Sequence, residues 1–354
     1  MLEIYCSGTP REIGFKHGSL AKEHVLGGIK FYEELFLKMC KLSWSDAQTA
    51  AKNFLPFLEE HVPHLIEEMR GIAEGAEVSF DAILALNCRT EISMGLMDDG
   101  CTSLGWKTDT FSIAAQNWDW DDKQKARLVL MHIKPARDGL TQRPNASVVT
   151  EAGMLCKSGI NSSGVTVLVN AVLAKGVKYD ALPVHVALRT SLESETRLKS
   201  VARLHSLTMG TSGHIMIGDK TGATSLEFSH MDVIQLDMID GQIAHTNHFL
   251  VKHHPSVKDA FIFPDSFKRM DRITLLLSEG QQRIKNGMTG KACVETMLED
   301  EDNFPTAINR KCSAIKPSET LYCFVADLEA KIAYLRLGRP TEPEGAWVLK
   351  PADL

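Results

Sequence analysis

The sequence lacks both an apolar run long enough to cross a membrane and an excess of positive charge. Its most apolar stretch, residues 165–174, is interrupted by Asn170 and falls far short of the roughly 20 residues that a transmembrane helix needs. The 39 basic residues face 45 acidic ones, which gives a net charge of -6. Because nucleic-acid binding needs a basic stripe that neutralises phosphates, this balance argues against a nucleic-acid partner. We therefore expect a soluble protein that binds neither membranes nor nucleic acids.

A secretory signal and a disulfide framework are also missing. Residues 1–10 carry an acid at position 3 and lack the basic start and apolar stretch of a signal peptide. The 8 cysteines show neither the regular spacing of a disulfide scaffold nor a CxxC metal knuckle. They are Cys6, Cys40, Cys88, Cys101, Cys156, Cys293, Cys312 and Cys323. These features predict a cytoplasmic protein in a reducing compartment.

The pattern of apolar residues changes near residue 100. In residues 1–100, apolar residues recur at three-to-four spacing, which predicts a nearly all-helical block with helices at 12–41, 45–60, 62–76 and 79–94. Beyond it, β-branched and aromatic residues predict strands at 111–118, 126–133, 154–158, 164–170, 214–217, 223–228, 233–236, 242–245, 320–327, 331–336 and 346–349. Helices are expected at 183–192, 196–207, 267–279 and 291–298. Separate blocks of helices and strands indicate an α+β or layered fold with antiparallel sheets.

Cys101 differs from the other cysteines by its position at this junction, directly after Asp98, Asp99 and Gly100. A cut before Cys101 would make it an N-terminal nucleophile whose free α-amine takes the thiol proton. Before cleavage, the same thiol could attack the Gly100 carbonyl and move the acyl group from nitrogen to sulfur, leaving a thioester that water resolves. Gly100 suits this step because it has no Cβ to obstruct the carbonyl.

The other cysteines have a plainer interpretation. A free cysteine is often a small buried hydrophobe, and the apolar surroundings of Cys40, Cys88, Cys156 and Cys323 fit that role.

Several ordered segments, spread from one end of the chain to the other, resemble a known family. They are Gly8-Thr-Pro-Arg-Glu-Ile-Gly14 with His17-Gly18, Glu68-Met-Arg-Gly-Ile-Ala73, Leu86-Asn-Cys-Arg-Thr-Glu91, Asp99-Gly-Cys-Thr102, Gln116-Asn-Trp-Asp119, Thr150-Glu-Ala-Gly153, His245-Thr-Asn-His248, Glu301-Asp-Asn303 and Leu337-Gly-Arg-Pro-Thr341. Together they are similar to the isopenicillin N acyltransferase family of cysteine N-terminal nucleophile hydrolases.

This resemblance implies a four-layered αββα fold that matures by autoproteolysis between Gly100 and Cys101. Residues 1–100 would form one chain and residues 101–354 another, which stay associated as a heterodimer and together make one catalytic domain. The resemblance further implies that Cys101 is the nucleophile, that Asp119 orients and tunes the new amine, and that Asn247 offers its side-chain amide to the oxyanion. Such an amide donor is worth roughly 3 to 4 kcal/mol.

Two further site residues follow from the resemblance. Arg310 falls where the family has an arginine linked to processing and substrate binding, although the segment just before it differs from the family pattern. Ser229, in Leu226-Glu-Phe-Ser, matches a family serine near the site.

Plainer interpretations of the same residues remain open. Asp119 stands in an acidic stretch, residues 118–122, where it could be solvated, and Arg310 with Lys311 could be an exposed basic pair. The histidines at 245, 248, 253 and 254 could suggest a metal site. They lack a companion carboxylate or cysteine pattern, so we predict no metal.

The predicted function is the formation of an acyl-thioester on Cys101 and transfer of the acyl group to water or an amine in small-molecule or secondary metabolism, without a cofactor. Acyl-coenzyme A is a possible donor substrate. Three alternatives stay open: an unprocessed Cys–His hydrolase with His185 or His245 as base, a β-alanyl-amine hydrolase-like activity, and a non-catalytic binding protein.

The C-terminus also bears on location. It reads Ala352-Asp-Leu354, with an acid where a peroxisomal tripeptide of the small-basic-leucine type has a base. We therefore expect the cytoplasm rather than the peroxisome.

Overall fold

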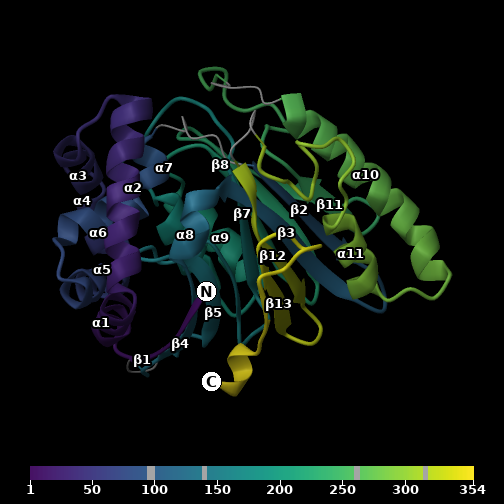
Figure 1. Ribbon diagram of the computed structural model, residues 1–354, viewed down its shortest axis with the longest axis horizontal. Helices are drawn as coiled ribbons and strands as arrows, with labels where there is room; N and C mark the ends of the chain where they lie inside the picture. Colours follow the sequence, from purple (N-terminus) through teal and green to yellow (C-terminus); the bar gives the residue numbers. More distant parts are fainter. Residues whose placement is uncertain (94–99, 138–141, 259–263, 314–317) are drawn as a thin grey trace.

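Two β-sheets lie face to face between two layers of helices (Figure 1). The computed structural model describes residues 1–93, 100–137, 142–258, 264–313 and 318–354. The larger sheet has eight strands in the order β1-β4-β5-β6-β7-β8-β9-β10, and the smaller has six in the order β11-β2-β3-β12-β13-β14. Every pairing between neighbouring strands is antiparallel except that of β1 with β4.

The strands of the larger sheet are β1 (Leu2–Gly8), β4 (Leu128–Pro135), β5 (Ala146–Glu151), β6 (Ser158–Asn161), β7 (Thr166–Asn170), β8 (Gly213–Asp219), β9 (Gly222–Phe228) and β10 (Val233–Asp237). Those of the smaller sheet are β2 (Gly100–Lys107), β3 (Ser112–Asp121), β11 (Gln242–His245), β12 (Ser318–Asp327), β13 (Ile332–Leu337) and β14 (Gly345–Leu349).

Helices cover the outer face of each sheet. Helices α8 (Val184–Leu192) and α9 (Arg197–Leu207) pack on the larger sheet, whereas α10 (Pro264–Lys285) and α11 (Gly290–Leu298) pack on the smaller one. One apolar core fills the space between the sheets and reaches under the N-terminal helices, and a second lies beneath α10 and α11. The layer order is therefore αββα, and the expected fold class is confirmed.

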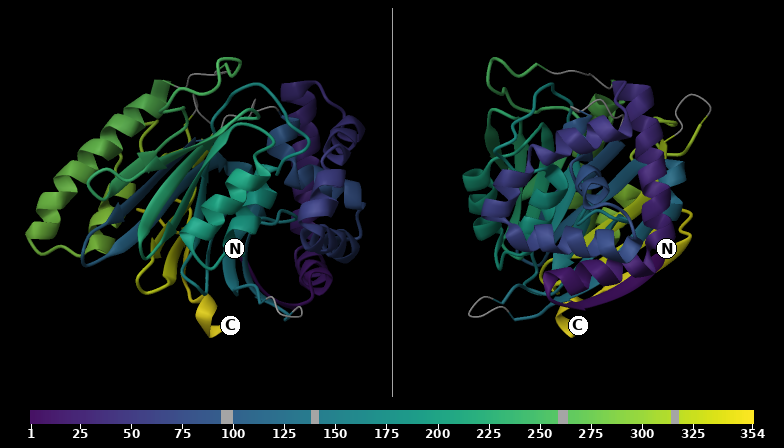
Figure 2. Two further views of the ribbon diagram at one scale, coloured as in Figure 1. Left: turned by 180° about the vertical axis from the view of Figure 1, so that it is seen from behind. Right: turned by 90° about the vertical axis from the view of Figure 1, so that its left-hand side faces the viewer.

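The remaining helices gather at the side of the molecule opposite α10 (Figure 2). They are α1 (Pro10–Leu20), α2 (Lys22–Cys40), α3 (Trp44–Lys52), α4 (Leu55–His61), α5 (Pro63–Ala76), α6 (Phe80–Asn87) and α7 (Arg89–Ile92), and two short 3-10 turns, η1 (Asp122–Arg127) and η2 (Pro351–Asp353), complete the elements. A methyl group at Gly14 of α1 would overlap the Glu68 carbonyl of α5, so this glycine lets the two helix backbones touch. Among the described residues, none of the helices is both long and apolar enough to span a bilayer.

The predicted elements differ from the observed ones in a few places. The stretch 12–41 is two helices that break at Ala21, and 45–60 is α3 followed by α4. The strand predicted at 154–158 is wrong, because only Ser158 belongs to β6 and the chain turns at Gly153, whose φ is +90°. Residue 94 of the predicted helix 79–94 lies outside the described residues.

Three strands were not predicted. They are β1, which places a strand inside the block that was expected to be almost all helical, β2 and β5, and β6 shares only Ser158 with the stretch predicted at 154–158. Strand β1 pairs with β4 along its whole length, from Leu2 opposite Val129 to Gly8 opposite Pro135. The N-terminal block therefore contributes an edge strand to a sheet whose other members all come from beyond residue 100.

Candidate active site

Strand β2 presents alternate side chains to two different layers of the fold. Ser103 Oγ donates to Asn170 Oδ1 of β7 at 2.8 Å, so the odd positions of β2, including Cys101, face the larger sheet. Arg269 of α10 donates to Thr102 Oγ1 at 3.1 Å, so the even positions face the outer helices. The fully buried Cys101 side chain thus points into the space between the sheets, while polar groups from the helix side reach its backbone.

The backbone of Cys101 is bound at both of its polar atoms. Its N–H donates to Asn247 Oδ1 at 2.9 Å, and its carbonyl oxygen accepts from Arg269 Nη1 at 2.5 Å. Arg269 Nη2 also donates to Asn247 Oδ1, at 2.8 Å. These three bonds link the strand, the loop after β11 and the first turns of α10 into one arrangement that fixes the residue.

Asn247 is oriented by two more contacts. Its backbone N–H donates to Ser266 Oγ at 2.7 Å, and its side-chain Nδ2 donates to the Ala171 carbonyl at 3.0 Å. The amide oxygen therefore faces the Cys101 nitrogen, and the amide nitrogen faces the segment after β7. The role of Asn247 as an oxyanion donor stays a prediction.

Asp119 lies beside Cys101 on the neighbouring strand β3, where the register places it opposite Gly100. Its Oδ2 accepts from Arg310 Nε at 3.1 Å, and its Oδ1 accepts from Thr320 Oγ1 at 2.7 Å. A Cβ added at Gly100 would stand 3.0 Å from both the Arg310 guanidinium and Asp119 Oδ2. The position before Cys101 is therefore fitted closely to a residue without a side chain.

A second carboxylate connects the two arginines of the site. Arg310 Nη2 donates to Asp265 Oδ2 at 2.6 Å, and Arg269 Nη2 lies 3.5 Å from the same oxygen. Asp265 and Arg269 are four residues apart on α10, so they project from one face of the helix. A continuous network thus runs from Asp119 through Arg310, Asp265 and Arg269 to the Cys101 backbone.

Burial dominates the electrostatics of this network. It raises the pKa of Asp119 from 3.8 to about 6, although Arg310 and Arg269 act in the opposite direction. It also lowers the pKa of Arg269, and the nearby charge of Arg310 adds to that effect. Two cations and two carboxylates are held together here out of water.

The structure brings together Gly100, Cys101, Asp119, Asn247 and Arg310. Ser229 lies instead in a separate polar cluster after β9, where its Oγ donates to Asp232 Oδ1 at 2.5 Å. Asp232 in turn contacts His253 Nδ1 at 2.7 Å. Arg310 is buried, so the exposed basic pair is excluded, and so is a solvated Asp119.

Arg269 and Asp265 are two buried members of the site that the sequence did not identify. Both lie in the first turns of α10, and Asp265 precedes the helix start predicted at 267. The only available signal is their i, i+4 spacing, which exposed ion pairs on helices share.

The two histidines considered as alternative bases are engaged elsewhere. Both ring nitrogens of His245 meet acceptors, since Nδ1 lies 2.9 Å from the Thr246 carbonyl and Nε2 lies 2.8 Å from Glu227 Oε1. His185 contacts the Cys156 carbonyl through Nδ1 at 2.9 Å, and its Nε2 has no hydrogen-bond partner among the described residues. Within this part of the chain, neither ring is hydrogen-bonded to Cys101, and no group of three or more His, Cys, Asp or Glu side chains is placed to hold a metal ion.

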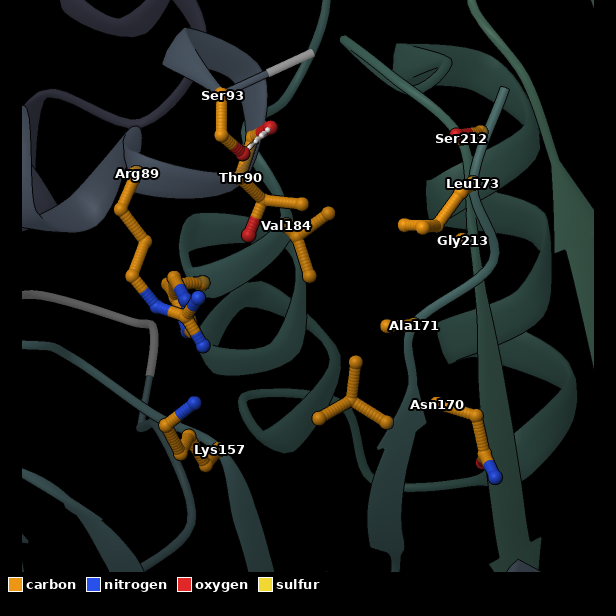
Figure 3. Close-up of a pocket in the computed structure, with 12 residues that line it drawn as sticks. Arg89, Thr90, Ser93, Lys157, Asn170, Ala171, Leu173, Val184, Ser212 and Gly213 are labelled. Carbon is orange, nitrogen blue, oxygen red and sulfur yellow. Dashed lines mark hydrogen bonds between the residues drawn. The ribbon is translucent and has the colours of Figure 1, made fainter. Parts of the chain in front are cut away.

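A pocket opens near this site at the end of strand β7 of the larger sheet, between α7, α8 and the start of β8. Figure 3 shows Arg89 and Lys157 on one side of it and Ala171, Leu173 and Ser212 on the other. The rest of its lining consists of Thr90, Ser93, Val169, Asn170, Val184, His185 and Gly213.

Contacts connect the pocket with the immediate neighbours of Cys101. Ala171 accepts the hydrogen bond from the Asn247 amide, and Lys157 Nζ lies 4.1 Å above the ring of Trp118. Trp118 stands opposite Cys101 in the strand register, so their side chains share a face of the sheet. Lining residues of the cavity are therefore linked to Cys101 through one intervening residue on each side, Trp118 and Asn247.

Comparison with known proteins gives consistent matches. The sequence profile of the family described as acyl-coenzyme A:6-aminopenicillanic acid acyl-transferase matches residues 106–342. The chain is 36% identical over 363 residues to the acyl-coenzyme A:6-aminopenicillanic-acid-acyltransferase 40 kDa form of Emericella nidulans, and the alignment covers 100% of this chain and 97% of that protein.

Two solved structures are also similar. One is a mutant conjugated bile acid hydrolase from Clostridium perfringens, with 13% identity, a TM-score of 0.48 and coverage of 70% of this chain and 92% of the other. The second is penicillin V acylase from Agrobacterium tumefaciens, with 13% identity, a TM-score of 0.41 and coverage of 70% and 85%.

Proposed function

Because this chain belongs to the acyl-coenzyme A:6-aminopenicillanic acid acyltransferase family, we propose that it is an autoprocessing enzyme whose mature nucleophile is Cys101. In this proposal, a thioester forms on Cys101 from an amide or an acyl donor, and the acyl group then passes to water or to an amine. Acyl-coenzyme A is one possible donor, and a β-alanyl amide is another candidate substrate.

Maturation begins with attack of the Cys101 thiol on the carbonyl carbon of Gly100. The carbon–sulfur bond forms, the carbon–nitrogen bond breaks, and the departing nitrogen takes a proton to become the α-amine of Cys101. Water then hydrolyses the thioester, which releases the Gly100 carboxylate and restores the thiol. The tight cradle of Asp119 and Arg310 around the Cα of Gly100 supports this step, because it restricts the position of the residue whose carbonyl group is attacked.

Turnover uses the amine that cleavage releases. We propose that Asn247 Oδ1 keeps its hydrogen bond to the Cys101 nitrogen and so leaves the nitrogen lone pair directed at the thiol. Arg269 donates to the Cys101 carbonyl and to Asn247, so its positive charge lies beside this amine and disfavours its protonation. Asp119 and Asp265 balance the charge of the network as a whole. One hydrogen of the Asn247 amide nitrogen binds Ala171, and the other is available for the oxyanion of the tetrahedral intermediate.

The observation that carries the proposal is the bond from the Cys101 N–H to Asn247 in a site where, among the described residues, neither His185 nor His245 is hydrogen-bonded to Cys101. The unprocessed Cys–His hydrolase is less well supported. His245 has both ring nitrogens engaged, and burial together with Lys157 and Arg89 lowers the pKa of His185 well below 6.5.

Cleavage would leave two chains, 1–100 and 101–354, in one heterodimer. The pairing of β1 with β4 supports their association, because a strand of the first chain lies hydrogen-bonded in a sheet formed by the second. Separation would expose this edge and the apolar core beneath the N-terminal helices.

The test is intact-mass spectrometry of the purified wild type beside Cys101→Ala and Cys101→Ser. We expect two pieces for the wild type, with masses of residues 1–100 and 101–354, and one uncut chain for Cys101→Ala. Cys101→Ser is expected to cleave slowly, because a hydroxyl is a weaker nucleophile than a thiolate. A wild type that remains one chain and still turns over amides would reject the proposal and favour a Cys–His hydrolase.

A further inference from the structure

The tautomer of His185 is fixed by a single contact. This residue lies in the first turn of α8 and is buried, with Nδ1 2.9 Å from the carbonyl oxygen of Cys156. A carbonyl oxygen only accepts hydrogen bonds, so Nδ1 carries the ring hydrogen and Nε2 keeps a lone pair. Burial and the nearby charges of Lys157 and Arg89 lower the pKa of His185, which keeps the ring neutral. Its Nε2 is therefore an acceptor.

This acceptor belongs to a residue of the pocket wall. His185 lines the cavity with Val169, Leu173 and Val184, and Nε2 has no hydrogen-bond donor among the described residues. Buried polar atoms in proteins usually have a partner, and an exception calls for an explanation such as a functional role, a water or an ion. The pocket thus combines an apolar wall with several polar side chains, and among them His185 Nε2 is an acceptor that no described residue satisfies.

The pocket is also placed to receive the part of the substrate that becomes attached to Cys101. The thiol faces the inner side of the sheet, and Trp118 beside it contacts Lys157 of the pocket. Asn247 donates to Ala171 on the opposite wall. The acyl group stays bound to the enzyme through both half-reactions and therefore needs an enclosed position. The water or amine that finally takes the acyl group must instead enter from solvent.

We propose that this pocket binds the acyl chain of the substrate and that His185 Nε2 accepts a hydrogen bond from a neutral donor, a hydroxyl or an amide N–H, on that chain. The apolar side chains of Val169, Leu173 and Val184 contact its carbon atoms. The cationic groups of Arg89 and Lys157 disfavour an ammonium at the same place. This assignment rests on the proposed thioester chemistry at Cys101 and specifies the substrate class of that site.

The experiment compares pairs of p-nitroanilide substrates that differ by one donor group. A series of straight acyl chains from acetyl to octanoyl is assayed beside the matching ω-hydroxyacyl series, with wild type, His185→Phe and His185→Gln. For the chain length that fits, we expect the wild type to prefer the hydroxyacyl substrate in kcat/KM by about 2- to 12-fold, the range of one neutral hydrogen bond. His185→Phe, which keeps a ring but has no acceptor, is expected to abolish the preference, and His185→Gln to retain part of it.

Self-cleavage of each variant, read by intact mass, shows whether its site is assembled. A wild type that is active but prefers neither series at any length would overturn this assignment and leave the proposed function standing. The same conclusion follows if cleaved His185→Phe keeps the full preference. A wild type with no Cys101-dependent turnover of the panel would overturn both.

Discussion

Gly100→Ala tests how closely the site is fitted to the bond that is cut. The added methyl group would stand 3.0 Å from the Arg310 guanidinium and 3.0 Å from Asp119 Oδ2, closer than ordinary van der Waals contact. Both side chains are buried and bonded to each other at 3.1 Å, so neither can move away freely. Inserting a methyl group into such packing typically costs about 1 to 3 kcal/mol.

The crowding between the added methyl group and the side chains of Arg310 and Asp119 should slow self-cleavage. If the transition state carries about 1 to 2 kcal/mol more of this strain than the folded precursor, the rate of cleavage falls by about 5- to 30-fold, since each 1.36 kcal/mol is about a factor of ten. The methyl group also stands beside the carbonyl that the thiol attacks, which adds to the loss. The assay is a time course of intact mass after rapid purification, with the rate of appearance of the 101–354 piece as the readout.

Gly105→Ala is the matched control on the same strand. Its methyl group would face the other layer, 2.6 Å from the Ala223 side chain, and does not touch Asp119 or Arg310. We expect it to reduce the free energy of unfolding at least as much as Gly100→Ala and yet to cleave at close to the wild-type rate. Normal cleavage by Gly100→Ala, or equal slowing by both variants, would refute the account of the cradle.

Three further predictions concern the buried network. Arg269→Lys keeps the charge but cannot bind the Cys101 carbonyl and Asn247 together, so we expect slower self-cleavage in a time course of intact mass. A cleavage rate equal to that of the wild type would show that these two hydrogen bonds of Arg269 do not contribute. Thr320→Val removes the 2.7 Å bond to Asp119, which should destabilise the protein by about 1 to 2 kcal/mol in denaturant titration; an unchanged midpoint would contradict this. Burial raises the pKa of Asp119 from 3.8 to about 6, so its stabilising contribution is fully present below pH 3.8 and is lost as pH rises through about 6. The stability of a Cys101→Ala protein relative to Cys101→Ala/Asp119→Asn should therefore fall by about 2 kcal/mol between pH 4 and 7 in denaturant titration, and a constant difference would contradict the burial argument.

The family resemblance implied the αββα layers and most of the residues near Cys101. It did not identify the buried residues of α10 that contact the Cys101 backbone. Cys101, Asp119, Asn247 and Arg310 were identified through family-like segments, and the structure places them together. Arg269 was not, because α10 is rich in charged residues at many positions and the sequence does not distinguish a buried arginine from an exposed one. Burial of Arg269 depends on Asp265, Asn247 and the strand beneath, which are contacts between distant parts of the chain.

The missed strands have a similar cause. Strands β2 and β5 are buried on both faces, so they show no regular alternation of polar and apolar residues, and β1 stands alone before a long helical block. The break at Ala21 went undetected because the buried residues of α2, among them Val25, Tyr32 and Phe36, continue the three-to-four spacing of α1. Hydrophobic periodicity reports which face of a helix is buried and does not report where the axis changes direction.

The most direct test of the central claim is mass spectrometry of the 101–354 chain during turnover, quenched in acid and mapped by peptides. We predict a free α-amine on Cys101 together with an acyl group on its sulfur that neutral hydroxylamine removes. An acyl group found on any other side chain, or turnover by a chain that still carries the Gly100–Cys101 peptide bond, would contradict it.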